Sequence, residues 1–138
     1  MTAPSPRSGE TGVMVEISPG ELIDKITILE IKSQRLSDPS RRFNVTTELE
    51  LLVAARDAAL PAPAELDDLT DALREVNGDL WSIEDDLRAC ESRGDFGPGF
   101  VALARSVYRL NDRRAALKRE INLLLRSRLM EEKSHPLY

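Results

Sequence analysis

The sequence contains few cysteine, histidine and aromatic residues, and each shortage argues against a class of function or structure. Among its 138 residues, Cys90 is the only cysteine and His135 the only histidine. An internal disulfide is impossible, and a cysteine-based metal site is not expected. Ser-His-Asp catalysis, Cys-His catalysis and histidine-rich zinc sites would all need a second subunit. The aromatic content of 4% is typical of a core built from packed Leu, Ile and Ala helices.

Long apolar runs are missing too. No stretch approaches the roughly 18 apolar residues of a membrane span, and the N-terminus lacks the charged-then-apolar pattern of a secretion signal. We therefore expect a cytoplasmic protein without a membrane partner. At 41% hydrophobic and 31% charged residues, the chain should form one globular domain with a modest core. We expect a disordered tail over residues 1–12, a helical domain over 13–133 and a C-terminal tail over 134–138.

The stretch Ser18–Arg35 predicts the central helix of the domain. Ser18 and Glu21 form a capping box, and Pro19 suits the first helical position. The apolar residues fall on two opposite sides, one formed by Leu22, Ile26 and Leu29 and the other by Ile28 and Ile31. A helix with two apolar sides should lie between neighbours.

Three more helices are predicted from about Asn44 to Leu60, Ala64 to Arg93 and Gly99 to Met130, while the first helix should end near Ser37. A basic turn is expected at residues 40–42, and residues 13–17 should form a short extended segment. The predicted fold class is all-α. It is a four-helix bundle-like domain with a long C-terminal antiparallel helical hairpin and a short N-terminal extended segment.

Acidic and basic residues are distributed unevenly along the chain, whose net charge is −5. Residues 48–91 contain thirteen acidic and three basic side chains, whereas residues 105–128 contain eight basic and two acidic ones. The simplest interpretation is that these segments pack together and largely neutralise each other. The alternative is that the basic helix binds a phosphorylated small molecule. Nucleic acid fits less well, because the chain is acidic overall and offers few aromatic rings for base stacking.

Two predicted helices carry polar residues where packing alone would not place them. Trp81 stands away from the leucine stripe, on the face shared by Asn77, Glu84, Asp85 and Arg88. Arg114 falls inside the apolar stripe of the last helix, and a buried guanidinium needs a carboxylate partner. Its candidate partners are Asp24, Glu30, Glu84 and Asp85.

Two interpretations of these polar residues stay open. In one, they form a network that fixes which helices pair. In the other, an anion is held by Arg105, Arg109 and Arg113 with Lys25 or Lys32, and Asp24, Glu84, Asp85 or Asp112 hold Mg²⁺ or a water. Asp24, Glu84 and Asp85 are the candidate metal ligands. The candidate cluster comprises Asp24, Lys25, Lys32, Glu84, Asp85, Arg88, Arg105, Tyr108, Asn111, Asp112 and Arg114.

Three strings, Ser18–Lys32, Leu80–Arg88 and Ala104–Ala115, resemble a family of small bacterial proteins known only as a domain of unknown function. The resemblance extends from Val15 to about Lys133. It implies an association with glycosyltransferases of bacterial cell-surface polysaccharide assembly, and it brings no catalytic residue. All-α nucleoside triphosphate pyrophosphohydrolases and helical chorismate mutases fit less well, because the former order their carboxylates differently and the latter have an upstream arginine that is absent here.

The leading hypothesis is a cytoplasmic helical interaction or assembly module, a homodimer or the binder of another protein, without a cofactor. The alternative is a small Mg²⁺-dependent enzyme or binding protein for a phosphorylated ligand, a nucleotide or nucleotide sugar. The two differ in geometry. A ligand site requires Asp24, Glu84, Asp85, Arg105 and Asp112 to converge on an open cleft, whereas a structural network requires them to be paired and closed.

Overall fold

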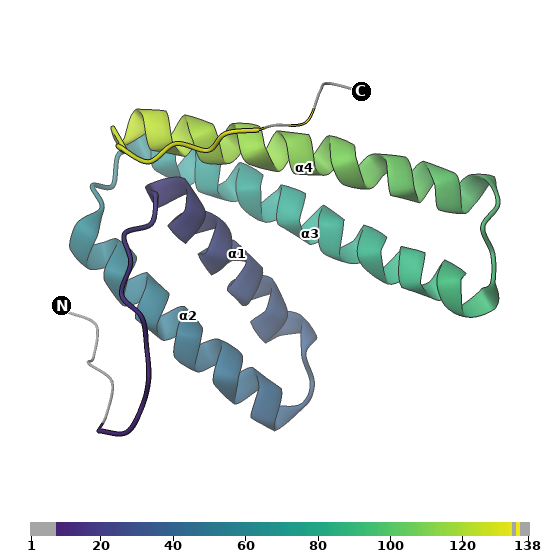
Figure 1. Ribbon diagram of the computed structural model, residues 1–138, viewed down its shortest axis with the longest axis horizontal. Coiled ribbons are helices and arrows are strands. Elements are labelled where there is room, and N and C mark those ends of the chain that lie inside the picture. The colour runs from purple at the N-terminus through teal and green to yellow at the C-terminus, as the bar shows by residue number, and fades with distance from the viewer. Residues whose placement is uncertain (1–7, 134, 136–138) are drawn as a thin grey trace.

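The computed structural model describes residues 8–133 and 135, and within them the chain forms four helices and no strand. The helices are α1 (Pro19–Arg35), α2 (Pro39–Ala59), α3 (Ala64–Arg93) and α4 (Pro98–Leu124) (Figure 1). The predicted all-α class is therefore confirmed. No described helix combines the length and apolar character that a membrane span requires. Most of the two predicted tails, residues 1–7, 134 and 136–138, lies outside the described residues.

The helices form a bundle in which α1 is the central element. It contacts α2, α3 and α4, whereas α2 contacts α1 alone among the four helices. Helices α3 and α4 form a long antiparallel hairpin, and α1 and α2 lie beside one end of it (Figure 1). The other end of the hairpin, with its turn at residues 94–97, projects beyond α1 and α2.

Helix α1 begins as its sequence predicts. The Ser18 hydroxyl oxygen accepts a hydrogen bond from the Glu21 N–H at 3.1 Å, and Pro19 occupies the first turn. Buried residues occur on several sides of the helix, which fits its central position: Gly20, Leu22, Ile23, Asp24, Ile26, Thr27, Leu29 and Ile31. By contrast, α2 has no buried residue along its 21 residues.

Two predicted helix boundaries were wrong. Helix α2 begins at Pro39 rather than near Asn44, because Asp38 caps it by accepting a hydrogen bond from the Ser40 N–H at 3.3 Å. The expected basic turn at residues 40–42 is therefore the first turn of this helix. Helix α4 ends at Leu124 rather than near Met130, since Arg126 adopts a left-handed conformation with φ of 56° and the chain turns back.

The N-terminal extended segment lies on the surface. Val13, Met14 and Val15 are 69–95% exposed, and residues 11–17 belong to no helix or strand. Arg128 holds the segment by donating two hydrogen bonds of 2.6 Å to the Glu16 carboxylate. The segment is thus tied to the chain that follows α4 through one exposed ion pair.

The hydrophobic core sits at one end of the hairpin. It joins α1 to α3 and α4 through Ile23, Leu66, Leu73, Val76, Leu80, Leu117 and Ile121. We call residues 64–80 and 111–124 the proximal half of the hairpin, and residues 81–93 and 98–110 the distal half. In the distal half only Cys90 is buried. The fold therefore has a three-helix core at one end and a bare two-helix arm at the other.

Candidate functional site

A buried carboxylate, Asp24, links α1 to both helices of the hairpin. The Arg114 Nε donates to Asp24 Oδ1 at 2.8 Å, and its Nη2 donates to Oδ2 at 2.5 Å. The Asn77 amide donates to Asp24 Oδ1 and to Thr27 Oγ1, both at 2.9 Å. The Asp24 side chain is 1% exposed and that of Arg114 30%. The carboxylate that Arg114 was expected to need is therefore Asp24.

A second polar cluster lies one to two turns further along α4. The Lys118 ammonium, 9% exposed, contacts Glu21 at 2.7 Å and Glu131 at 3.2 Å. The buried Asn122 accepts a hydrogen bond from the Gly20 N–H at 2.7 Å through its Oδ1. Its Nδ2 is buried without a hydrogen-bond partner among the described residues. These contacts fix the start of α1 against the end of α4.

The helices approach each other very closely at Gly20. A Cβ placed on Gly20 would overlap the backbone oxygen of Lys118 and would lie 2.9 Å from Asn122 Oδ1. Only glycine, which has no Cβ, fits this contact. The Gly20 position therefore belongs to the same structural unit as the two polar clusters.

The cations of both clusters are held in their charged form. The hydrogen bond to Asp24 raises the pKa of Arg114 above its ordinary value. Burial lowers the pKa of Lys118, but the hydrogen bond to Glu21 and the charges of Glu21, Asp24 and Glu131 outweigh it, so that the pKa is raised. Groups that keep their charge near neutral pH suit a fixed ion-pair network better than general acid–base chemistry.

The other predicted site residues do not join Asp24 and Arg114. Lys25 contacts Glu48 at 3.4 Å on the surface, Lys32 is half-buried, and Asp112 pairs with Lys133. The remaining ones lie on the outside of the hairpin: Glu84, Asp85, Arg88, Arg105, Tyr108 and Asn111. Glu84 lies seven residues beyond Asn77 on α3, which is about 10 Å along the helix axis.

The three candidate metal ligands are dispersed in the same way. Asp24 is buried under Arg114, whereas Glu84 and Asp85 are exposed on the distal half. Across residues 8–133 and 135, no three histidine, cysteine, aspartate or glutamate side chains form a group that could hold a metal ion. The Mg²⁺ hypothesis stays a prediction without a formed site in this part of the chain.

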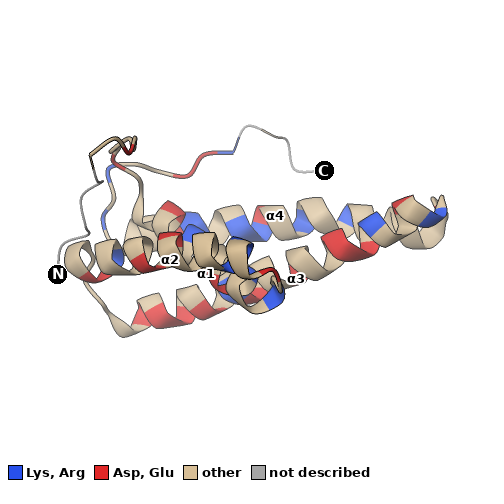
Figure 2. Ribbon diagram, turned by 90° about the horizontal axis from the view of Figure 1, so that it is seen from below, with Lys and Arg blue, Asp and Glu red and all other residues tan. Residues whose placement is uncertain are grey.

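The opposite charges of α3 and α4 remain apart. The two helices pack against each other as expected. However, within the described residues no ion pair joins an acidic residue of α3 to a basic residue of α4: the pairs of Arg114 and Lys118 are made with α1 and with Glu131. Figure 2 shows the acidic residues spread along α3 and the basic ones along α4. Direct ion pairing between the two helices is therefore not how this charge is balanced.

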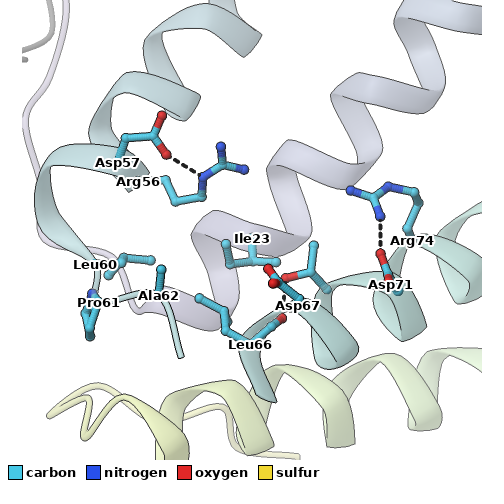
Figure 3. A pocket seen from close by; sticks show the side chains of 11 residues that line it. Ile23, Arg56, Asp57, Leu60, Pro61, Ala62, Leu66, Asp67, Asp71 and Arg74 are labelled. Carbon is cyan, nitrogen blue, oxygen red and sulfur yellow. Dashed lines mark hydrogen bonds and ion pairs between the residues drawn. The ribbon is translucent and has the colours of Figure 1, made fainter. Parts of the chain in front are cut away.

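A cleft of about 590 Å³ opens between the end of α2, the start of α3 and α1. Figure 3 shows that both of its arginines are bonded to carboxylates. Arg56 contacts Asp57 at 3.0 Å, and Arg74 contacts Asp71 at 2.7 Å. Arg74 also bonds Glu30 at 2.8 Å, and this bond raises its pKa. Because both arginines already have carboxylate partners, the cleft is a poor anion site, and none of the predicted site residues lines it.

Comparison with models of known protein families shows to which family the chain belongs. The model of a family of unknown function, DUF6165, matches residues 13–137. The chain belongs to this family. No curated protein and no solved structure gives a match. The DUF6165 match spans all four helices and both polar clusters, and it confirms the resemblance to a domain of unknown function.

Sequence reasoning missed several residues of this DUF6165 core. Thr27, Lys118, Asn122 and Gly20 were not among the candidates, although each makes or permits a buried contact between helices. One signal was available. Arg114, Lys118 and Asn122 follow each other at intervals of four residues, so they form a polar row on one face of α4. Such a row predicts a polar neighbour, which α1 provides.

Proposed function

We propose that this DUF6165 chain is an interaction or assembly module that works through the distal half of its hairpin. What supports the proposal is the contrast between two sets of polar groups. Those of the proximal half are paired with each other and closed by α1. Those of the distal half face outward, beside apolar side chains that remain partly exposed. This arrangement suits the binding of a macromolecule better than the turnover of a small substrate.

The apolar side chains of the distal half carry the proposal. Val101 is 50% exposed and Tyr108 is 47% exposed, and Phe96 in the adjoining turn is 54% exposed. Trp81 is only half-buried. Partly exposed apolar side chains among exposed charged ones are typical of protein interaction sites, where aromatic residues provide most of the binding energy.

The alternative function rests on one observation. Arg105, Arg109 and Arg113 follow each other at intervals of four residues on α4, and all three are exposed. Such a row attracts phosphate groups, as binding of a nucleotide or nucleotide sugar would require. Arg109 lines an open hollow of about 390 Å³ between α3 and α4. The described residues hold no formed Mg²⁺ site beside it, so the interaction module is the better-supported function. The cytoplasmic location and the association with bacterial cell-surface glycan assembly remain predictions.

Photo-cross-linking inside cells tests the interaction module. A benzophenone amino acid replaces Tyr108 on the distal half or, as a control, Leu123 on the proximal half of the same helix. Leu123 is 60% exposed, so both positions are accessible. We expect discrete cross-linked products from position 108 and none from position 123. No product from position 108, or the same products from both positions, would contradict the proposal.

A ligand screen tests the alternative. Thermal unfolding is followed with nucleotides, nucleotide sugars and sugar phosphates, with and without Mg²⁺. A ligand at about 100 times its dissociation constant stabilises the folded state by about 2.7 kcal/mol. We expect no such shift. A shift that disappears in Arg109→Ala but persists in Arg119→Ala would favour the ligand-binding function.

A further inference from the structure

The chain turns back after α4 and runs along it. Helix α4 ends at Leu124, Arg126 has a left-handed backbone, and the residues that follow lie along α4 in the direction of the distal half (Figure 1). We call residues 128–133 the strap. None of its residues is buried, and within the described part of the chain its backbone groups make no hydrogen bond with other backbone groups. The strap is therefore not held by core packing or by secondary structure.

Three consecutive strap residues attach it to α4 through their charge. The Glu131 carboxylate lies 3.2 Å from the Lys118 ammonium. The Arg119 guanidinium donates to Glu132 Oε1 at 2.8 Å and to the backbone oxygen of Glu131 at 2.9 Å. The next residue, Lys133, pairs with a carboxylate of α4. The order of charges on the strap, two acidic and then one basic, thus matches two cations and one carboxylate on the helix.

The strap spans a hollow instead of packing onto the helix. A space of about 340 Å³ lies between the two segments. It is lined by Ala115 and Ala116 of α4, and by the charged residues Asp112, Arg119, Glu131, Glu132 and Lys133. The contact between the strap and α4 is therefore ionic at its edges and open in its middle.

The fold does not need the strap to satisfy its buried charge. Lys118 is 9% exposed, but it has a second partner in Glu21 of α1 at 2.7 Å, closer than Glu131. Arg119 and Lys133 are 46% and 31% exposed, so both reach water when their pairs open. Lifting the strap thus leaves no buried charge without a partner, which would be the costly outcome. Exposed ion pairs are individually weak and are screened by salt.

We infer that the strap is a releasable, autoinhibitory cover: it occupies the face of α4 around Ala115 and Ala116 and excludes an acidic protein segment that would bind there. Two carboxylates of such a segment replace Glu131 and Glu132 at the two cations of α4. Because the strap belongs to the same chain, its effective concentration at α4 is high, and it outcompetes a free segment until its ion pairs are broken. This inference concerns the proximal half and does not depend on the interaction function of the distal half.

Paramagnetic relaxation in the full-length protein tests whether charge holds the strap. A nitroxide is attached at Glu120→Cys, an exposed position next to Arg119, while the buried Cys90 does not react. The label should broaden the amide signals of residues 131–133. In 1 M salt, where the screening length is about 3 Å, we expect this broadening to fall at least about twofold. No broadening at low salt, or equal broadening at both salt concentrations, would overturn the inference.

Exchanging charges at the end of the strap tests the pairing itself. Lys133→Asp brings like charges together at Asp112 and should reduce the broadening of residues 131–133 as salt does. Adding Asp112→Lys recreates the pair in reverse and should restore the broadening. The control Arg113→Gln, which removes an exposed arginine next to Asp112 and outside the strap contacts, should have no effect. Failure of the rescue would contradict the proposed attachment.

A spin-labelled peptide tests whether the strap excludes an acidic segment. The peptide Arg-Leu-Met-Glu-Glu-Lys has the sequence of residues 128–133 and carries a nitroxide at its N-terminus. It should broaden the amide signals of Ala115 and Ala116 in the full-length variant Glu131→Gln/Glu132→Gln at least about threefold more than in the wild type, whose strap competes. A peptide with glutamine at both glutamate positions should broaden neither.

The peptide experiment has two outcomes that would overturn the inference. Equal broadening in the variant and the wild type would show that the strap excludes nothing. No broadening in the variant would show that this face of α4 does not take an acidic segment. Circular dichroism confirms that each variant is folded, so that a negative result reports on the face and not on unfolding.

Discussion

The two halves of one hairpin use the same helices in opposite ways. In the proximal half, α1 covers the groove, Leu73 is fully buried and the charge of Arg114 is met by Asp24. In the distal half, the groove is bare, Val101 is half exposed and the arginines of α4 have no carboxylate partner within the described residues. The proximal half therefore provides the stability of the isolated chain, whereas α1 and α2 leave the distal half uncovered.

Removing the buried carboxylate should give the largest effect. Asp24→Ala leaves Arg114 and Asn77 without their shared partner, and breaking a buried ion pair costs about 3 to 5 kcal/mol. We expect a loss near the lower value, because Arg114 is 30% exposed and can reach water. Urea unfolding measures it. The control Glu84→Ala, in the distal half, should change the free energy of unfolding by less than about 0.5 kcal/mol; equal losses would contradict the contrast between the halves.

Replacing one leucine in each half by alanine should show how much the packing of that half contributes to the free energy of unfolding. Leu73 is 0% exposed, and deleting such a side chain down to alanine costs about 3 kcal/mol through lost burial and the cavity left behind. Leu87 occupies the equivalent stripe position in the distal half but is only half-buried, so Leu87→Ala should cost less than half as much. The measurement is urea unfolding at a protein concentration where the chain is monomeric. A larger loss for Leu87→Ala would show that the distal half has a core of its own.

A methyl group at the α1–α4 contact should destabilise the proximal half. Gly20→Ala forces a Cβ against the backbone oxygen of Lys118, and such overpacking costs about 2 kcal/mol. Gly99 follows a proline at the start of α4 just as Gly20 does in α1, and a Cβ there would meet nothing within 4 Å. Gly99→Ala should be neutral or stabilise by up to about 1 kcal/mol. Differential scanning calorimetry of the two variants measures these changes in stability. It distinguishes the steric overlap at Gly20 from the general effect of replacing a helical glycine by alanine.

The sequence predicted the four helices and a carboxylate partner for Arg114, but it left four candidates for that partner. Periodicity located α3 from Ala64 to Arg93 as observed, and the position of Arg114 in an apolar stripe correctly required a buried carboxylate. The predicted start near Asn44 leaves Asp38 and Pro39 outside α2, whereas Asp38 caps this helix and Pro39 occupies its first turn. The boundary depends on whether the Asp-Pro pair ends the preceding helix or begins the next one.

The contacts of Gly20, Lys118 and Asn122 could not be predicted, because they depend on where α1 crosses α4. That crossing is set by packing over the whole core rather than by any local pattern. Packing over the whole core also determines that the residues of the candidate cluster lie apart. Helical periodicity placed Glu84 and Asn77 on one face of α3, but it could not show that α1 ends between them. The uncovered half of the groove is thus a property of the tertiary structure alone.

The smallest predicted effect concerns the exposed pair that ties residues 13–17 to the proximal end. The hydrogen bonds from Arg128 lower the pKa of Glu16 below its ordinary value of 4.5. The contribution of this pair to holding the segment is therefore complete above pH 4.5 and is lost as the pH falls through the lowered pKa. An NMR titration of the Glu16 carboxyl carbon should show a midpoint below 4.5 in the wild type. In Arg128→Gln the midpoint should return toward 4.5, and 1 M salt should narrow the difference because both groups are exposed. Identical midpoints in both proteins would mean that the segment is not held by this pair, and that its position depends on contacts other than those of Glu16.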